Sequence, residues 1–199
     1  MNNLMLPFAT TIFIGLGATL TFDLWGLFLK RAFKVAPSNI CLVGRWLRYM
    51  AHGTFNHANI VSTPPKRAEC AAGWMAHYLI GVSFAGVFVL ITGNEWLLQP
   101  RLVPAVIFGV VTVLAPFLIM QPAFGFGFAA SKTANPPQAR LRSLMNHGAF
   151  GVGVFLFGWL AKWYYRYLLE ANSLGLGFAV LTLVRPYRWG VYRNKNTPG

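Results

Sequence analysis

Four stretches of this chain are each apolar enough and long enough to cross a lipid bilayer. A helix of about 20 residues covers the roughly 30 Å of hydrocarbon in a membrane. The four stretches run over residues 6–29, 73–92, 102–124 and 147–165. Only 11% of the 199 residues are charged, whereas a soluble domain has about 25%. The sequence therefore predicts an all-α fold, a polytopic transmembrane helical bundle that forms one domain over residues 1–199.

Basic side chains predict how these spans are threaded. Seven lysines and arginines lie between the first two spans, one between the second and third, and three between the third and fourth. Because basic loops stay in the cytoplasm, we expect the N-terminus outside and the first and third loops inside. A fifth apolar run over residues 168–184 would return the basic tail to the cytoplasm. The prediction is thus four spans plus a fifth, with the N-terminus out and the C-terminus in.

The long loop between the first two spans contains an amphipathic segment at residues 40–50. Ile40, Val43 and Leu47 recur at helical spacing, and Arg45 and Arg48 lie on the other side. This pattern is typical of a helix that lies in the headgroup layer. The two cysteines of the chain, at positions 41 and 70, belong to the same loop. In a cytoplasmic loop we expect them to be reduced thiols.

Ionisable and polar side chains inside the spans mark a candidate site. A charged side chain in a span costs about 2.5–3.5 kcal/mol on insertion scales and usually faces the bundle interior. Asp23 and His77 lie on stripes of small residues, which are the faces where helices approach closely. The predicted intramembrane cluster consists of Asp23, His77, Gln121 and His147. The alternative is that Asp23 and a histidine form only a structural hydrogen bond between helices.

A second hypothesis is a metal or haem site on the same side of the membrane. Imidazole and carboxylate ligands suit zinc, iron or copper. The candidate ligands are His52, His57, Glu69, His77 and His147. The spacing of His52 and His57 does not place both rings on one helical face. We therefore favour a protein without a cofactor and keep a transition metal or haem as the alternative.

The formal charge of +13 indicates an anionic partner, and the apolar majority favours the membrane over nucleic acid. Four arginines in the loops are candidates for contact with lipid phosphate: Arg45, Arg48, Arg140 and Arg142. The expected partners are the lipid bilayer and its anionic lipids. Glycine stripes along several spans would also suit other membrane subunits or a second copy of the chain.

Several segments resemble an uncharacterised family of small, multi-span proteins of the bacterial inner membrane. These segments include GLGATLTFDLWGLFLKRAF, LVGRWLRYMAHGTFNH and the long run VTVLAPFLIMQPAFGFGFAASKTANPPQARLRSLMNHGAFGVG. The resemblance covers about residues 11–160. It implies a multi-pass protein of the bacterial inner membrane, and it supplies no activity, ligand or catalytic residue.

The function that these features favour is non-enzymatic. Hydrolase and metalloprotease motifs such as GxSxG and HExxH are absent from the sequence. We expect a small membrane carrier or accessory subunit with a pocket of histidine and aspartate that faces the cytoplasm. Asp23 would respond to protons or cations, with His77 and His147 as its partners. The alternatives are a metal- or haem-binding oxidoreductase and a protein that recognises anionic lipid headgroups.

Overall fold

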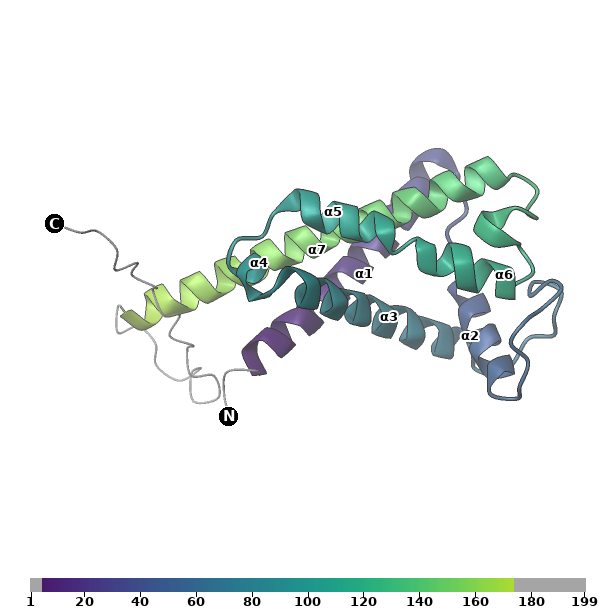
Figure 1. Cartoon of the computed structure of the whole chain (residues 1–199), viewed down its shortest axis with the longest axis horizontal. Coiled ribbons are helices and arrows are strands. Elements are labelled where there is room, and N and C mark those ends of the chain that lie inside the picture. Colours follow the sequence, from purple (N-terminus) through teal and green to yellow (C-terminus); the bar gives the residue numbers. More distant parts are fainter. Residues whose placement is uncertain (1–4, 174–199) are drawn as a thin grey trace.

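A computed structural model describes the backbone of residues 5–173, and these residues form helices and no strands. Three long helices cross the molecule: α1 (Met5–Phe33), α3 (Glu69–Thr92) and α7 (Pro136–Ser173). Shorter elements are α2 (Ile40–Met50), α4 (Asn94–Leu98), α5 (Leu102–Val111), η1 (Pro116–Met120), α6 (Gln121–Ala123) and η2 (Phe128–Ala130). The three long helices and the α5–α6 segment lie lengthwise along an elongated molecule (Figure 1). Four segments are long and apolar enough to span a membrane: Phe8–Phe33, Glu69–Thr92, Leu102–Ala123 and Pro136–Tyr164.

The predicted fifth span does not begin at residue 168. Residues 168–173 continue α7, which runs without interruption from Pro136 to Ser173. At 1.5 Å per residue, its 38 residues make a helix of roughly 57 Å, well beyond the thickness of the hydrocarbon layer. The remainder of the predicted span, residues 174–184, lies outside the described residues. On its own it is shorter than the ~17 residues that a spanning helix needs.

Proline interrupts the predicted third span, as the sequence of this span indicates. Pro116 has no backbone N–H, so it cannot donate to the carbonyl of Thr112 four residues earlier. The N–H of Ala115 takes that role instead, 3.2 Å from the Thr112 oxygen, and residues 116–120 continue as a π-helix. π-helical turns of this kind are frequent at functional sites. The interruption lies next to Thr112, which is described with the candidate site below.

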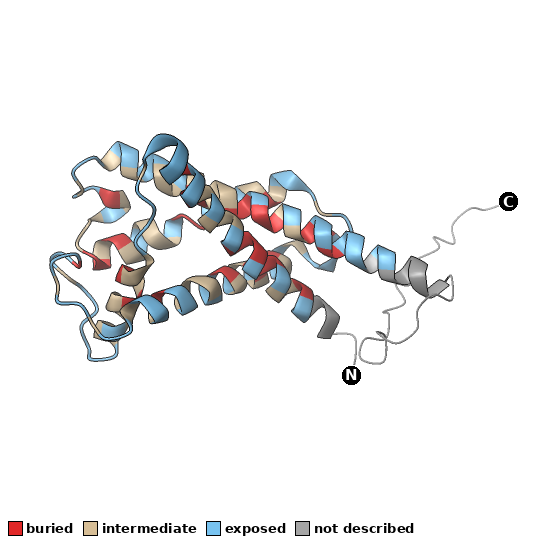
Figure 2. Cartoon of the chain, turned by 180° about the vertical axis from the view of Figure 1, so that it is seen from behind, coloured by how far each residue is buried: buried red, intermediate tan, exposed pale blue. Residues whose placement is uncertain are grey.

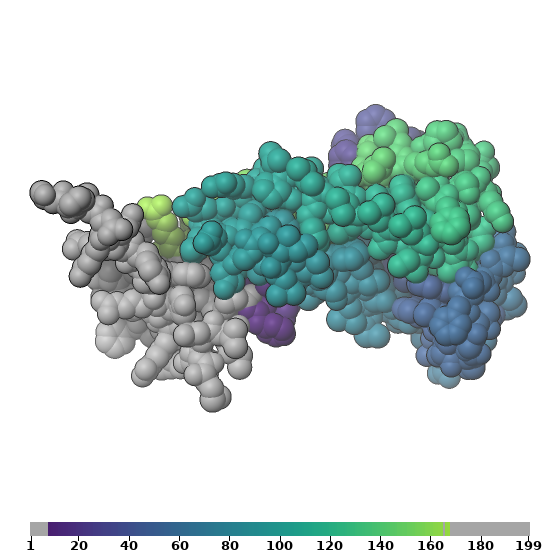
Figure 3. Space-filling view, viewed as in Figure 1, coloured from purple at the N-terminus to yellow at the C-terminus, as the bar shows by residue number. Residues whose placement is uncertain are grey.

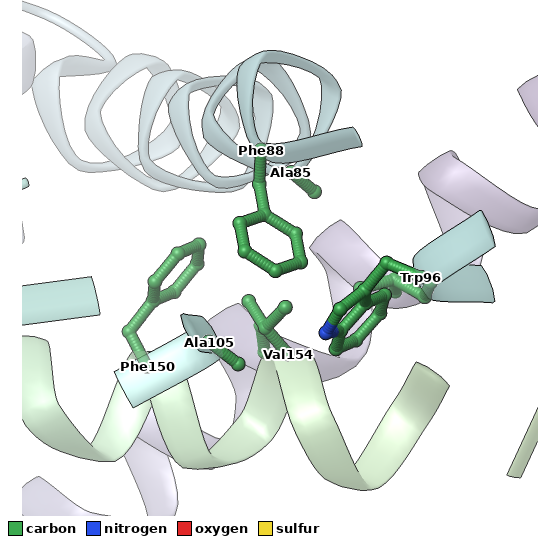
Figure 4. Packing of buried hydrophobic residues seen from close by; sticks show 8 residues of the cluster. Ala85, Phe88, Trp96, Ala105, Phe150 and Val154 are labelled. Atoms are coloured by element: carbon green, nitrogen blue, oxygen red, sulfur yellow. The ribbon is translucent and has the colours of Figure 1, made fainter. Parts of the chain in front are cut away.

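Buried side chains form a core in the half of the bundle where α1 begins. This cluster joins α1, α3, α4, α5 and α7, and Figure 4 shows the ring of Phe88 above Val154 with Trp96 and Phe150 on either side. The rings of Phe88 and Trp96 meet edge to face, 4.7 Å apart. Large apolar residues with 40% or more of their surface exposed lie along the outer faces of the spans, as the pale blue and red faces of each helix in Figure 2 show. Such outer faces suit a lipid environment.

Close helix contacts depend on glycine at two crossings. A Cβ added to Gly15 would meet the backbone of Val82, so α1 and α3 touch through their main chains. A Cβ added to Gly151 would lie 2.6 Å from the Ala105 oxygen and 2.7 Å from the Cα of Val106, which shows the same contact between α7 and α5. Small residues at such crossings allow backbones to approach closely in membranes. The predicted small-residue stripes of the first two spans therefore face each other.

The α2 end of the bundle, which comprises α2, the loop of residues 51–68 and residues 124–135, closes over the other ends of the spans. It has its own small core of Leu42, Ile60 and Phe124. The N–H of His57 donates to the Ala123 oxygen at 2.8 Å and ties the loop to the third span. In Figure 3 the loop and the 124–135 segment form one continuous surface at the right. The predicted amphipathic helix over residues 40–50 coincides with α2.

Cys41 and Cys70 form a disulfide, which corrects the expectation of two reduced thiols. The physical reason is the register between α2 and α3. A Cβ on Gly44 would overlap the backbone of Glu69 and Gly73, so the two helices lie in main-chain contact there. One turn earlier on α2, this contact brings the Cα atoms of the two cysteines within 4.0 Å.

Candidate intramembrane polar site

Asp23 and His77 meet inside the bundle, between the first and second spans. The Nε2 atom of His77 lies 2.9 Å from Oδ1 of Asp23. The hydroxyl of Tyr78 donates to the other carboxylate oxygen, Oδ2, at 3.1 Å. Both oxygens of the carboxylate therefore have a partner, as a buried charged group requires. The side chains of His77 and Asp23 remain 16% and 19% exposed, so the pair is not sealed from its surroundings.

Aromatic rings enclose the imidazole of His77. The ring centroids of Phe22, Trp74 and Tyr78 lie 5.3, 5.8 and 5.7 Å from that of His77, each in an edge-to-face arrangement. Edge-to-face contacts of this kind contribute about 0.5–1.5 kcal/mol beyond the area they bury. They hold the imidazole in one orientation, with Nε2 directed at Asp23. The position of His77 is thus set by the rings and by the carboxylate together.

His147 pairs with the third span and not with Asp23. Its Nδ1 atom lies 2.7 Å from Oγ1 of Thr112, and the Thr112 hydroxyl also lies 2.5 Å from the carbonyl of Gly109. A hydroxyl has one proton and a carbonyl only accepts, so both bonds coexist when His147 Nδ1 carries a proton and donates it. The ring of Phe22 contacts both histidines edge to face, with centroid distances of 5.3 Å to His77 and 5.8 Å to His147.

Gln121 lies apart from the other three residues of the predicted cluster. It is nine residues after Thr112 along the third span, roughly 13 Å by helical rise. Its side chain is buried, and its Oε1 atom has no hydrogen-bond partner among the described residues. The structure therefore brings Asp23 and His77 together, places His147 beside them in contact with Phe22, and leaves Gln121 nearer the α2 end.

Sequence reasoning missed Tyr78 and Thr112, which complete the two polar pairs. A phenol and a hydroxyl inside apolar spans are common and carry no spacing signal of their own. For Tyr78, the available signal was its place next to His77 on a helix whose small-residue stripe faces α1. For Thr112, it was the neighbouring Pro116, because an interrupted helix exposes polar groups to a neighbour.

The five predicted metal ligands do not form one site. Among the side chains that the structure describes, no three from His, Cys, Asp or Glu lie together as metal ligands. His52 is bonded to the Arg48 carbonyl at 2.9 Å, and His57 lies beside Thr63 and the ring of Tyr49. Glu69, His77 and His147 are held by Arg45, Asp23 and Thr112 respectively. The five residues therefore do not converge, because each of them is held by a different partner.

A family model described as "protein of unknown function (DUF2938)" matches residues 12–161 of the chain. The chain belongs to this family. The match covers all four spans and the α2 end, and so both polar pairs described above. Comparisons with curated proteins and with solved structures find no match. The family assignment therefore agrees with the resemblance seen in the sequence and adds no activity or ligand.

The four arginines predicted to contact lipid phosphate have different surroundings in this DUF2938 protein. The guanidinium of Arg45 makes a two-pronged contact with Glu69, at 2.9 and 2.7 Å, and donates to the carbonyls of Ile60 and Thr63. The hydrogen bond to Glu69 raises the pKa of Arg45 above its ordinary value. These partners use most of its donors, and contact of Arg45 with a lipid phosphate stays a prediction.

The remaining three arginines lie nearer the surface. Arg140 donates to the Ala129 carbonyl at 2.8 Å, and Arg142 donates to the Ala36 carbonyl at 2.9 Å. The side chain of Arg48 is exposed, and its guanidinium makes no hydrogen bond or ion pair with the described residues. A groove of about 600 Å³ lies between α1 and α7. Asp23, His77 and His147 are not among its lining residues, so it is distinct from the polar site.

Proposed function

We propose that this protein is a non-enzymatic carrier or accessory subunit of the bacterial inner membrane. Its Asp23–His77 pair would take up and release a proton inside the membrane. The observation that carries the proposal is the 2.9 Å contact between an imidazole and a carboxylate within two apolar spans. Ionisable residues inside spans are functional by default because their burial is costly. A histidine has its ordinary pKa closest to neutral pH of all the side chains, which suits a proton-responsive role.

The neighbours of the pair support reversible protonation over a purely structural role. Tyr78 donates to Asp23 independently of His77, so the carboxylate keeps one partner when the imidazole changes its charge. The partial exposure of both side chains supports access for a proton. His147 has its own hydroxyl partner, and the ring of Phe22 contacts both histidines. The pair can therefore change its protonation state without breaking the contact between the third and fourth spans.

We further propose that the α2 end faces the cytoplasm, which puts the N-terminus outside. Ten lysines and arginines among the described residues lie in α2, in its loops or at the adjoining helix ends, and three lie towards the opposite end. This asymmetry is the pattern of the positive-inside rule. The disulfide at the same end would favour an oxidising compartment. We give more weight to the charges, because they act during insertion, whereas a disulfide depends on later redox conditions.

The protonation proposal is tested by infrared spectroscopy of the purified protein in lipid as the pH is lowered. We expect a carboxylic acid C=O band that appears on acidification and is missing in Asp23→Asn. Glu95→Gln is the matched control, because Glu95 is an exposed carboxylate in α4. A spectrum of Asp23→Asn identical to that of the wild type would contradict the proposal.

Proton flux into vesicles distinguishes a carrier from an accessory subunit. The protein is reconstituted with a pH-sensitive dye inside the vesicles and driven by a potassium gradient with valinomycin. A carrier gives uptake that falls at least several-fold in Asp23→Asn and His77→Gln and is unchanged in Glu95→Gln. Uptake equal to that of empty vesicles would contradict the carrier role. The accessory role would then be supported by the infrared result alone.

The orientation is tested with single cysteines in a background of Cys41→Ser and Cys70→Ser. Ser62→Cys lies in the exposed loop of the α2 end, and Gln99→Cys lies at the opposite end. An impermeant maleimide applied to intact spheroplasts should label Gln99→Cys at once and Ser62→Cys only after permeabilisation. The reverse pattern would show that the α2 end faces outward.

A further inference from the structure

We infer that the groove between α1 and α7 binds one anionic phospholipid, with an acyl chain in the groove and the phosphate at Arg31 and Arg142. The inference is independent of the proton-responsive role proposed above. The groove has a volume of about 600 Å³. Its lining residues are Thr21, Leu24, Trp25 and Phe28 of α1 with Met145, Ala149 and Val152 of α7.

The groove runs along the helices, from mid-bundle towards the α2 end. On α1 its lining residues span positions 21 to 28, and on the antiparallel α7 they span 152 to 145. Seven residues of helix correspond to roughly 10 Å along the axis. A groove of this length and apolar lining accommodates part of an acyl chain that lies parallel to the other lipids. An acyl chain in this direction places its headgroup at the α2 end.

Basic side chains lie at the mouth of the groove. Arg31 follows Phe28 by three residues and thus lies on the groove side of α1, whereas Lys30 lies on the opposite side of the helix. Arg31 is exposed and makes no ion pair or hydrogen bond with the described residues. Arg142 precedes Met145 by three residues and reaches across to the Ala36 carbonyl just beyond α1. Guanidinium groups bind phosphate with paired hydrogen bonds, so the two arginines favour an anionic headgroup.

The indole of Trp25 supplies a third, independent observation. Trp25 lines the groove, and its Nε1 atom is buried without a hydrogen-bond partner. A buried indole N–H normally finds an acceptor, because leaving it unpaired costs free energy. Ester and phosphate oxygens of a lipid are such acceptors. Pairing this donor with an ester oxygen requires the indole to turn towards the groove, because Nε1 has almost no accessible surface.

The proposal is tested by native mass spectrometry of the detergent-purified protein, titrated with dioleoyl phosphatidylglycerol or dioleoyl phosphatidylcholine. These lipids share their chains, so their difference reports the headgroup. We expect phosphatidylglycerol to bind about tenfold more tightly. Equal binding of the two lipids would overturn the anionic headgroup. Displacement of phosphatidylglycerol by millimolar inorganic phosphate would show that the arginines bind free phosphate. This result would overturn the assignment of a phospholipid as the ligand.

Matched pairs of variants locate the site. Val152→Phe fills the groove, and Val87→Phe adds the same bulk to the exposed face of α3. We expect the first to weaken phosphatidylglycerol binding at least tenfold and the second to leave it within twofold. Arg31→Gln should remove the preference for phosphatidylglycerol, whereas Lys30→Gln on the opposite side of the helix should keep it. Equal effects within either pair would overturn the assignment.

A third pair of variants tests the indole. Trp25→Phe keeps an aromatic ring in the groove and removes the N–H, and Trp159→Phe makes the same change on an exposed face of α7. We expect Trp25→Phe to weaken binding several-fold and Trp159→Phe to have no effect. Circular dichroism of each variant checks that the helices are retained. Wild-type affinity in a folded Trp25→Phe protein would overturn the hydrogen bond to the lipid.

Discussion

The contact between α5 and α7 predicts opposite effects for two glycine-to-alanine changes on the same helix. At Gly151 an added Cβ would lie 2.6 Å from the Ala105 oxygen and 2.7 Å from the Cα of Val106, both of which are backbone atoms. At Gly148 an added Cβ would meet no atom within 4 Å. The two positions are about one turn apart on the same helix, and they differ in that Gly151 is buried and Gly148 is half-buried.

The magnitudes follow from two opposing terms. Alanine is more favourable than glycine within a helix by about 1 kcal/mol. Overpacking against atoms that cannot rotate away costs about 1–3 kcal/mol, because α5 and α7 must separate. We therefore expect Gly151→Ala to lower the free energy of unfolding by up to about 2 kcal/mol, and Gly148→Ala to raise it by up to about 1 kcal/mol.

The assay is reversible unfolding in mixed micelles with increasing mole fraction of dodecyl sulfate, followed by circular dichroism and tryptophan fluorescence. The difference between the two variants, about 1–3 kcal/mol, equals the overpacking cost, because effects common to both cancel. A Gly151→Ala protein as stable as Gly148→Ala would refute the close backbone contact between α5 and α7. The variant Gly86→Ala, whose added Cβ would lie 4.0 Å from Thr11, is a second control on α3.

Three further predictions concern the polar contacts and the disulfide. Glu69→Gln leaves Arg45 without a charge partner, and the side chains of the pair are nearly buried, at 11% exposure for Glu69 and 12% for Arg45. We expect a loss of about 2 kcal/mol in stability, which lies between the values for exposed and buried pairs. Limited proteolysis of the 51–68 loop should accelerate in the same variant and not in Glu95→Gln. Thr112→Val removes the partner of His147 and should cost about 1 kcal/mol, whereas Thr112→Ser should stay near the wild type; equal stability of the two would contradict the hydrogen bond. Maleimide labelling of the denatured protein should find no thiol before reduction and two after it, and Cys41→Ser should expose one thiol without reductant. Two reactive thiols before reduction would refute the disulfide.

Much of the fold follows from the sequence because hydropathy and length define spans. Three of the four predicted spans match continuous helices, although two of these helices begin earlier than predicted. The prediction began the second span at residue 73 and the fourth at 147, where the apolar runs begin. Both helices extend past the apolar run because the α2 end supplies partners, Arg45 for Glu69 and the Ala36 carbonyl for Arg142. A charged residue therefore marks the end of an apolar run in the sequence, but the helix can continue past it.

The site could be predicted only in part, because pairings depend on helix register. Small-residue stripes indicate which faces meet, and Asp23 and His77 lie on such stripes. The sequence does not say that these two residues meet while His147 takes Thr112, since that depends on close contacts such as the one at Gly15. The disulfide was missed for the same reason. The separation of 29 residues between the cysteines does not indicate whether they pair. Their pairing depends on how α2 packs against α3.

The two polar pairs have a consequence for how the chain is made. Asp23 finds His77 and Tyr78 in the very next span, and Thr112 finds His147 in the span that follows it. A polypeptide enters the membrane from its N-terminus onward, and an unpaired carboxylate in a span costs about 2.5–3.5 kcal/mol on insertion scales. The first two spans can therefore leave the translocon as a hairpin whose charge is already paired. Along the spans the second hairpin then joins the first through apolar and glycine surfaces, and neither polar pair waits for a distant partner during synthesis.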